Sequence, residues 1–302
     1  MSTSSTNQAA DTTVEFAAAG DGAQTVEING NRLAVEVLGP PGAPVVLTHH
    51  GAPGLGSRAE PRASFGRLAD TYRVVVFDAR GSGASEGRGP YTHEQWAADL
   101  DGLRAWVGAE RVCVAGGSYG GFMAMEYAIR YPERVAAMVL RDTAPDNSHS
   151  ELARANALAS DRVEVDMELF DRIDSGQVRD DEDLARCWRA ILPLYDFHYD
   201  PESVERKVAA TPYRYEAHNY AFAHNLPGWD ISDQLPGITA PTLVTVGRTD
   251  WITPVECSEK IAALVPDARL VVFERSGHSP QIEEAEAWTA TVRSFLGQVY
   301  PA

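Results

Sequence analysis

Short apolar runs alternate with helix-length segments in two separate parts of this chain. The first part contains four such runs, PVVLTH (44–49), RVVVFDA (73–79), RVCVAG (111–116) and RVAAMVLRD (134–142). The pattern returns in PTLVTVG (241–247) and ARLVVFERSG (268–277). Continuous apolar, β-branched strands between helices are typical of a parallel sheet that helices cover on both faces. The sequence therefore predicts an α/β fold in which both parts contribute to one mostly parallel sheet.

The segments outside this alternation define the domain organisation. Residues 1–23 are rich in Ser, Thr, Ala and Gln without periodicity, which is typical of a flexible tail. The alternating sequence TVEINGNRLAVEVLG at about 25–39 surrounds an Asn-Gly pair and predicts a β-hairpin. Between 146 and 230 the chain has helical patterns and many charges but no buried strand. We therefore predict a core formed by residues 24–145 and 231–302, with a helical insertion at 146–230.

Composition excludes several classes of function. The 302 residues carry 26 Lys and Arg against 43 Asp and Glu, a formal net charge of −17, which disfavours nucleic acid and anionic membranes as partners. The first residues lack the basic and apolar regions of a secretory signal, and no run is long enough to span a membrane. We therefore expect a soluble, cytoplasmic protein whose oligomeric state the sequence leaves open.

Cysteine and histidine spacing predicts no metal site. The three cysteines, Cys113, Cys187 and Cys257, are odd in number and far apart, so a disulfide framework or a metal knuckle is not expected. The eight histidines form no HExxH pattern and no close pairing with carboxylates. We therefore expect no metal site.

The strongest local motif is Gly116-Gly117-Ser118-Tyr119-Gly120, which lies between an apolar strand and an amphipathic helix. A serine in a sharp strand-to-helix turn has a strained backbone, and small residues two positions away on either side avoid a collision. The serine then lies at a helix amino terminus, where the dipole and free N–H groups favour negative charge. This context predicts that Ser118 is a catalytic nucleophile.

A carboxylate and an imidazole follow two later strands. Asp250 comes after PTLVTVG, and His278 comes after ARLVVFER. The carboxyl ends of parallel strands share one edge of the sheet, where open α/β sheets bind their ligands. The chain order Ser, Asp, His therefore predicts a triad in which His278 is the base and Asp250 orients it. Asp142, directly after the strand that ends at Arg141, is a rival position for the acid.

Three motifs together identify a family resemblance. His50-Gly51-Ala52-Pro53-Gly54, FDARGSGAS (77–85) and the GGSYGG elbow resemble the proline iminopeptidase branch of the α/β hydrolases. The segment 228–254 is similar to the family's return from cap to core, whereas the cap sequence itself is much less similar. Ala52 occupies the position of the second glycine in the family's usual HGGPG motif.

The resemblance implies a fold, a mechanism and an oxyanion site. The fold would be an eight-stranded, mostly parallel sheet with helices on both faces and a helical cap inserted after the sixth strand. The backbone N–H groups of Ala52 and Tyr119 would bind the oxyanion, and Gly51 would contact the substrate. The reaction would be a two-step acyl transfer on Ser118 that requires no cofactor.

The resemblance also implies how a substrate amine would bind. Glu216, in RYEAHNY (214–220), is similar to one cap carboxylate with which iminopeptidases hold the free amino terminus. A second family glutamate is expected near 187–200, but only Asp196 and Asp200 occur there. We expect the aromatic residues Trp188, Tyr195 and Tyr220 to line an apolar substrate pocket.

Three classes of function remain open from the sequence. The first is an aminopeptidase, or an amino-acid amide or ester hydrolase, that acts on a small molecule or short peptide with a free amine. The second is an esterase or lactonase of specialised metabolism without amine recognition. The third is a non-catalytic binding protein, which would be expected to show a broken triad or lost elbow glycines.

Overall fold

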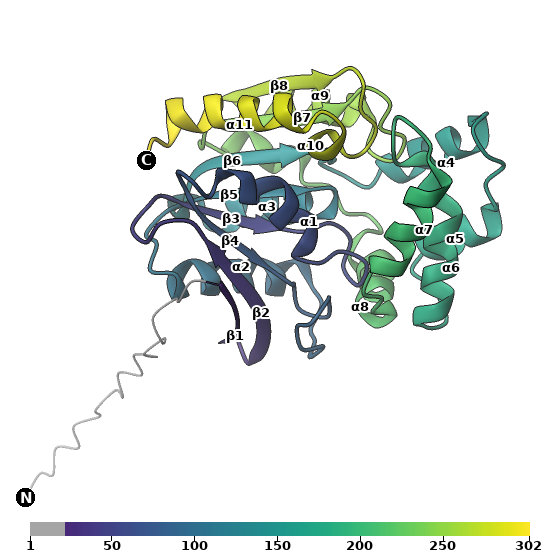
Figure 1. Cartoon of the computed structure of the whole chain (residues 1–302), viewed down its shortest axis with the longest axis horizontal. Helices are drawn as coiled ribbons and strands as arrows, with labels where there is room; N and C mark the ends of the chain where they lie inside the picture. Colours follow the sequence, from purple (N-terminus) through teal and green to yellow (C-terminus); the bar gives the residue numbers. More distant parts are fainter. Residues whose placement is uncertain (1–21) are drawn as a thin grey trace, which may run out of the picture.

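The computed structural model describes residues 22–302 (Figure 1). The predicted tail therefore lies outside the described residues except for its last two positions, since strand β1 begins at Gly22. Among the described residues, no helix has both the length and the apolar character that a membrane span requires.

The described residues contain one eight-stranded sheet with the spatial order β1-β2-β4-β3-β5-β6-β7-β8. Strand β2 pairs antiparallel with β1 and with β4, and the other neighbouring strands are parallel. The predicted hairpin is confirmed, and Asn29 and Gly30 at its turn both have positive φ. The strands are β1 (Gly22–Ile28), β2 (Asn31–Leu38), β3 (Val45–His49), β4 (Arg73–Phe77), β5 (Val112–Gly117), β6 (Val135–Arg141), β7 (Thr242–Gly247) and β8 (Ala268–Phe273).

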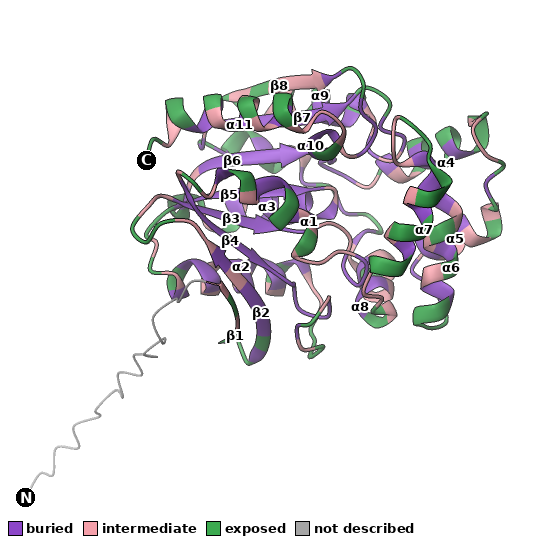
Figure 2. Cartoon of the chain, in the orientation of Figure 1, coloured by how far each residue is buried: buried purple, intermediate pink, exposed green. Residues whose placement is uncertain are grey.

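Alternate residues of the central strands enter two different cores, because successive side chains of a strand point to opposite faces. In β5, Val112 and Val114 pack on one face, whereas Cys113 and Ala115 pack on the other. Figure 2 shows these strands as the most buried part of the chain. Cys113 is a buried free cysteine, as are the other two cysteines.

The helices fall into two groups. The helices of the first group belong to the sheet domain, in which α2, α3 and α9 pack on one face of the sheet and α11 packs on the other. They are α1 (Ala59–Ser64), α2 (His93–Trp106), α3 (Tyr119–Arg130), α9 (Val255–Leu264), α10 (Pro280–Glu283) and α11 (Ala285–Val299). Those of the second group follow β6 and precede β7, and they are α4 (His149–Ala159), α5 (Met167–Asp174), α6 (Asp181–Ile191), α7 (Pro201–Ala210) and α8 (Tyr215–Tyr220).

The second group of helices forms the predicted cap. In Figure 1 these helices gather beyond the carboxyl ends of the strands, at the right of the view. They have a core of their own, in which Phe170, Ile173, Leu184 and Ile191 are buried against Trp251 of the sheet domain. The cap therefore covers the edge of the sheet at which the predicted catalytic residues emerge.

Candidate active site

Ser118 occupies a strained turn between β5 and α3. Its φ of 55° and ψ of −130° are unusual for a residue with a side chain, and such a conformation costs roughly 1–3 kcal/mol. Ser118 directly precedes the helix, whose first N–H groups have no partner within the helix. The local structure therefore places the hydroxyl at a positive helix end, which is the arrangement that a nucleophilic serine requires.

The glycines of the motif make this turn possible. A Cβ on Gly116 would collide with the backbone of Gly120, and one on Gly120 would collide with the carbonyl oxygens of His49 and His50. The turn is therefore packed backbone against backbone, both within itself and against the end of β3. This contact brings the nucleophile turn next to the loop that starts at His50.

His278 and Asp250 form a buried acid–base pair. The Nδ1 atom of His278 donates a hydrogen bond of 2.9 Å to Oδ2 of Asp250, and both side chains are almost completely buried. Asp250 is held by Thr253, whose hydroxyl and backbone N–H both donate to its carboxylate. Because Nδ1 carries the proton, Nε2 of the neutral imidazole is left as an acceptor for a hydroxyl proton.

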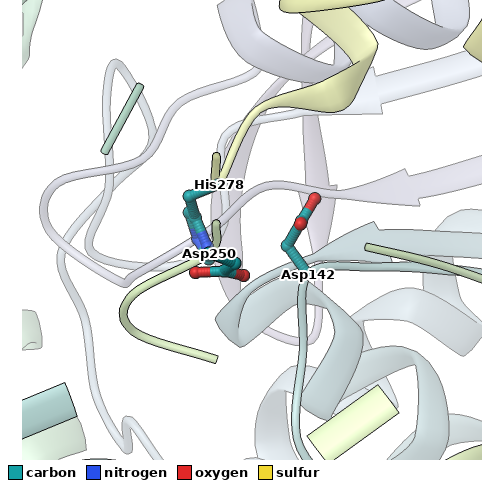
Figure 3. Close-up of side chains that lie close together, drawn as sticks. All are labelled: Asp142, Asp250 and His278. Carbon is teal, nitrogen blue, oxygen red and sulfur yellow. The ribbon is translucent and has the colours of Figure 1, made fainter. Parts of the chain in front are cut away.

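Asp142 lies beside this pair (Figure 3). Oxygens of Asp142 and Asp250 and a ring nitrogen of His278 all lie within 4.8 Å of one another. The hydrogen bond to His278 comes from Asp250, whereas Asp142 accepts from the backbone N–H of Gly247 and from Arg141. The guanidinium of Arg141 already supplies a positive charge to this cluster, so a hydrogen-bonded acid–base site explains it better than a cation site.

The electrostatics favour a charged Asp250 and a basic His278. Burial raises the pKa of Asp250, but its interactions with His278 and Thr253 outweigh this and lower it. Burial lowers the pKa of His278, but the negative charge of Asp250 and a smaller contribution from Asp142 raise it above its ordinary value. Burial and the neighbouring charge of Asp250 raise the pKa of Asp142 to about 7.

These shifts predict a pH dependence. If neutral His278 is the base, activity falls as pH drops through its pKa, and the acid limb of kcat/KM should lie above pH 6.5. Replacement of Asp142 by Asn should move this limb to lower pH, because one anion that stabilises the imidazolium is removed. A profile of kcat/KM against pH for both proteins checks this. An unchanged limb in the variant would contradict a contribution from Asp142.

The loop after β3 carries Ala52, one of the two predicted oxyanion residues, and α3 begins with the other, Tyr119. A Cβ on Gly51 would lie 3.7 Å from Cβ of Ser118, so this loop lies next to the nucleophile turn. The described non-glycine residues with positive φ are Asn29, Ser118 and Asp142, so Ala52 fits its place without left-handed strain. Tyr119 is the first residue of α3, and its N–H group has no partner within the helix.

Ser118 and His278 open onto one cavity of ≈ 340 Å³ between the sheet domain and the cap. Besides these two, five predicted residues line this cavity, namely Gly51, Ala52, Tyr119, Trp188 and Tyr195. Much of the remaining lining is apolar and comes from both domains, and it includes Leu55, Phe122, Phe170, Ile173, Ile191 and Trp251. A cavity of this size and character suits a small, largely apolar substrate.

Glu216 and Tyr220 are not among the residues that line the cavity. Glu216 is exposed on α8, which buries Ala217 and His218 instead. Tyr220, one turn further on, packs edge-on against Tyr91 at a ring-centroid distance of 6.0 Å. The helix orientation explains both placements, since residues four positions apart share a face and this face points away from the cavity.

Two carboxylates that the sequence did not single out do line the cavity. Glu60 of α1 accepts hydrogen bonds from Arg141 and Gln281, so its charge is already compensated. Asp174, the last residue of α5, accepts a hydrogen bond of 2.5 Å from the Ser150 hydroxyl, and burial raises its pKa. Neither residue belongs to a periodic or spaced motif, so no sequence signal pointed to them.

The fold and this site together define an α/β-hydrolase. A model of the α/β-hydrolase fold family matches residues 44–285, and the chain belongs to this family. A proline iminopeptidase of Pestalotiopsis fici, named PfmaB, is 37% identical over 279 residues, which are 90% of this chain and 98% of the relative. The chain therefore belongs to the branch that resembles proline iminopeptidases, and it is a hydrolase.

Other relatives have different substrates in their names. A 2-hydroxy-6-oxo-2,4-heptadienoate hydrolase of Pseudomonas putida is 30% identical over 84% of this chain and 89% of the relative. The solved structure of a thermophilic esterase from Thermogutta terrifontis is 31% identical, with a TM-score of 0.69 over 92% of this chain and 100% of that one. The comparisons thus support hydrolysis and leave the substrate open.

Proposed function

We propose that this protein is a serine hydrolase that works through an acyl-enzyme on Ser118. His278 takes the hydroxyl proton at Nε2 as Oγ attacks the substrate carbonyl, while Asp250 holds the imidazole and stabilises its charged form. The N–H groups of Ala52 and Tyr119 bind the resulting oxyanion. His278 then gives its proton to the leaving amine or alcohol, and water repeats the sequence to release the acid from Ser118.

One observation supports this mechanism above the others. The Nδ1 atom of His278 is committed to Asp250, and His278 and Ser118 line the same cavity. Arg141 connects the two sides of the site, because its guanidinium donates to the backbone oxygen of His278 and packs where a Cβ on Gly117 would lie. A largely apolar cavity next to such a pair is a suitable place for acyl transfer.

We further propose that the substrate is small, mainly apolar and carries a free amine, which Asp174 binds in place of Glu216. Asp174 is partly buried in the cavity wall, and a hydroxyl rather than a cation donates to it. A carboxylate in such surroundings gains a charge-assisted hydrogen bond when an ammonium arrives. The relationship to proline iminopeptidases supports an amino-acyl amide or ester as the substrate class.

Replacement of Asp174 by Asn tests the amine contact. Loss of a charge-assisted hydrogen bond of roughly 1.5–3 kcal/mol should raise KM for amino-acyl arylamides about ten- to a hundredfold. KM for N-acetylated analogues and for simple p-nitrophenyl esters should change less than about threefold. Steady-state kinetics on a panel of prolyl, alanyl and N-acetylated arylamides and esters measures both.

Glu216→Gln is the matched control, since it removes the same charge from an exposed position on the cap. It should leave KM for every member of the panel near the wild-type value. If Asp174→Asn raises KM equally for charged and uncharged substrates, the amine contact is wrong. If the protein hydrolyses simple esters but no substrate that carries a free amine, the esterase or lactonase alternative is favoured.

A further inference from the structure

The loop that carries Ala52 is bound to the FDARGSGAS segment by three separate contacts. The Nε2 atom of His50 accepts a hydrogen bond of 2.9 Å from the backbone N–H of Ala79. The N–H of Gly54 donates to the Ser82 hydroxyl at 2.9 Å. The third contact is an ion pair between Arg58 and Asp78. The two loops follow the neighbouring parallel strands β3 and β4, and the second loop thereby serves as a support for the first.

The contacts of His50 determine the position of its proton. The backbone N–H of Ala79 can only donate, so Nε2 of His50 must be the unprotonated nitrogen. The neutral ring then carries its proton on Nδ1, which lies 2.9 Å from the carbonyl oxygen of Gly51 and donates to it. His50 is completely buried, and burial lowers its pKa to about 4, so the ring stays neutral where the enzyme is expected to work.

The bond to Gly51 also orients the next N–H group. The peptide between Gly51 and Ala52 is planar, so in its trans form the direction of the Gly51 carbonyl sets the opposite direction of the Ala52 N–H. The carbonyl of Ala52 is held in turn by the N–H groups of Leu55 and Gly56, at 3.1 and 2.7 Å. Both peptide groups that adjoin Ala52 are thus fixed before any substrate binds.

Gly56 packs closely against this arrangement. A Cβ at Gly56 would collide with Nδ1 of His50 and would lie 3.0 Å from the Gly51 carbonyl oxygen. Gly56 does not have a positive φ, so its small size is what the position requires. The backbone of Gly56 therefore packs directly over the hydrogen bond between His50 and Gly51.

We propose that His50 is a positioning residue, whose neutral imidazole links Ala79 to Gly51 and so presets the Ala52 N–H for the oxyanion. This inference rests on the proposed function, because it assigns a task to the oxyanion site of that mechanism. It also assigns a role to the FDARGSGAS segment. This segment contributes no catalytic side chain, but the N–H of its Ala79 donates to Nε2 of His50 and so holds the ring in place. A preset donor costs no reorganisation in the transition state, which is the main advantage of an oxyanion site.

Two substitutions separate the two hydrogen bonds of His50. In His50→Asn, the side-chain amide can occupy the place of Nδ1 and keep the donor to Gly51, while the acceptor for Ala79 is lost. In His50→Gln, the longer side chain can keep the acceptor for Ala79, while the donor to Gly51 is lost. Each variant loses one hydrogen bond from a buried site, so thermal unfolding should show a similar loss of stability in both.

The kinetic effects should differ between the two variants. We expect His50→Gln to lower kcat about a hundredfold or more with KM within about threefold of wild type, as for the loss of an oxyanion donor. His50→Asn should stay within about tenfold of the wild-type kcat. If kcat fell equally in both variants, in proportion to their loss of stability, His50 would have only a structural role and the proposal would be overturned.

A second measurement does not depend on turnover. Nitrogen-15 NMR of the full chain labelled at histidine should show His50 with a protonated Nδ1 and an unprotonated Nε2 from pH 6 to 8. A proton on Nε2 would overturn the proposal. Failure of the proposed function is recognised separately, since the wild-type protein would then show no turnover that depends on Ser118.

Discussion

Replacement of Ser118 by alanine is expected to lower kcat by about a million-fold, as it does when a serine nucleophile is removed from a triad. No covalent intermediate can then form, and only the oxyanion donors and substrate binding remain. Initial rates on the best ester or arylamide of the panel, with the wild-type protein as reference, measure the loss. The substitution also removes little volume, so circular dichroism and the melting temperature should stay close to those of wild type.

The same variant separates enzyme from binding protein. A burst of product in the wild-type protein, absent from Ser118→Ala, would show acyl-enzyme accumulation. Ser118→Ala that retained near-wild-type hydrolysis would end the covalent mechanism. A wild-type protein that bound candidate substrates without ever turning them over would instead revive the non-catalytic class.

Replacement of Asp250 by Asn is expected to lower kcat by about ten-thousand-fold. The Asn amide can donate as well as accept, so it no longer fixes the proton of His278 on Nδ1. Being neutral, it also does not stabilise the imidazolium that forms as Ser118 attacks. Thr253, which donates to Asp250 from its hydroxyl and its backbone, would also lose a charged acceptor. Kinetics at several pH values separate a lower maximum rate from a shifted pH profile.

Asp142→Asn is the matched control, because Asp142 is an equally buried carboxylate in the same cluster. It makes no hydrogen bond to His278 among those of the described residues, so we expect its kcat within about tenfold of wild type at the optimum pH. If Asp142→Asn lowered kcat as much as Asp250→Asn, both carboxylates would act together as the acid that orients His278. If it alone were damaging, Asp142 would be the triad acid.

The main features of the fold and of the acid–base site could be predicted from the sequence. Short, continuous apolar runs such as RVCVAG alternate with helices, and this alternation is typical of buried parallel strands. Polar residues that follow such strands must meet at one edge of the sheet, so the sequence predicts that Ser118, Asp250 and His278 lie close together. The structure adds the bond between His278 and Asp250, which distinguishes Asp250 from Asp142.

The cap could not be predicted in the same detail. Its helices pack mainly on one another and on a few residues such as Trp251, so the face that each turns to the cavity depends on its partners. Glu216 matched a family position yet lies exposed, whereas Asp174 matched nothing and lies in the cavity wall. A helix of six residues such as α8 carries too little pattern to reveal its inward face.

The sequence by itself determined the order of strands and helices, the turn at Ser118 and the three catalytic candidates, because these depend on neighbouring residues and on strand ends. Only the tertiary structure decided which carboxylates line the cavity and how the loop at Ala52 is held. Those features depend on contacts between distant segments, such as His50 with Ala79 and Asp174 with Ser150. A pattern of single residues along the chain does not encode the direction in which one packed loop faces another.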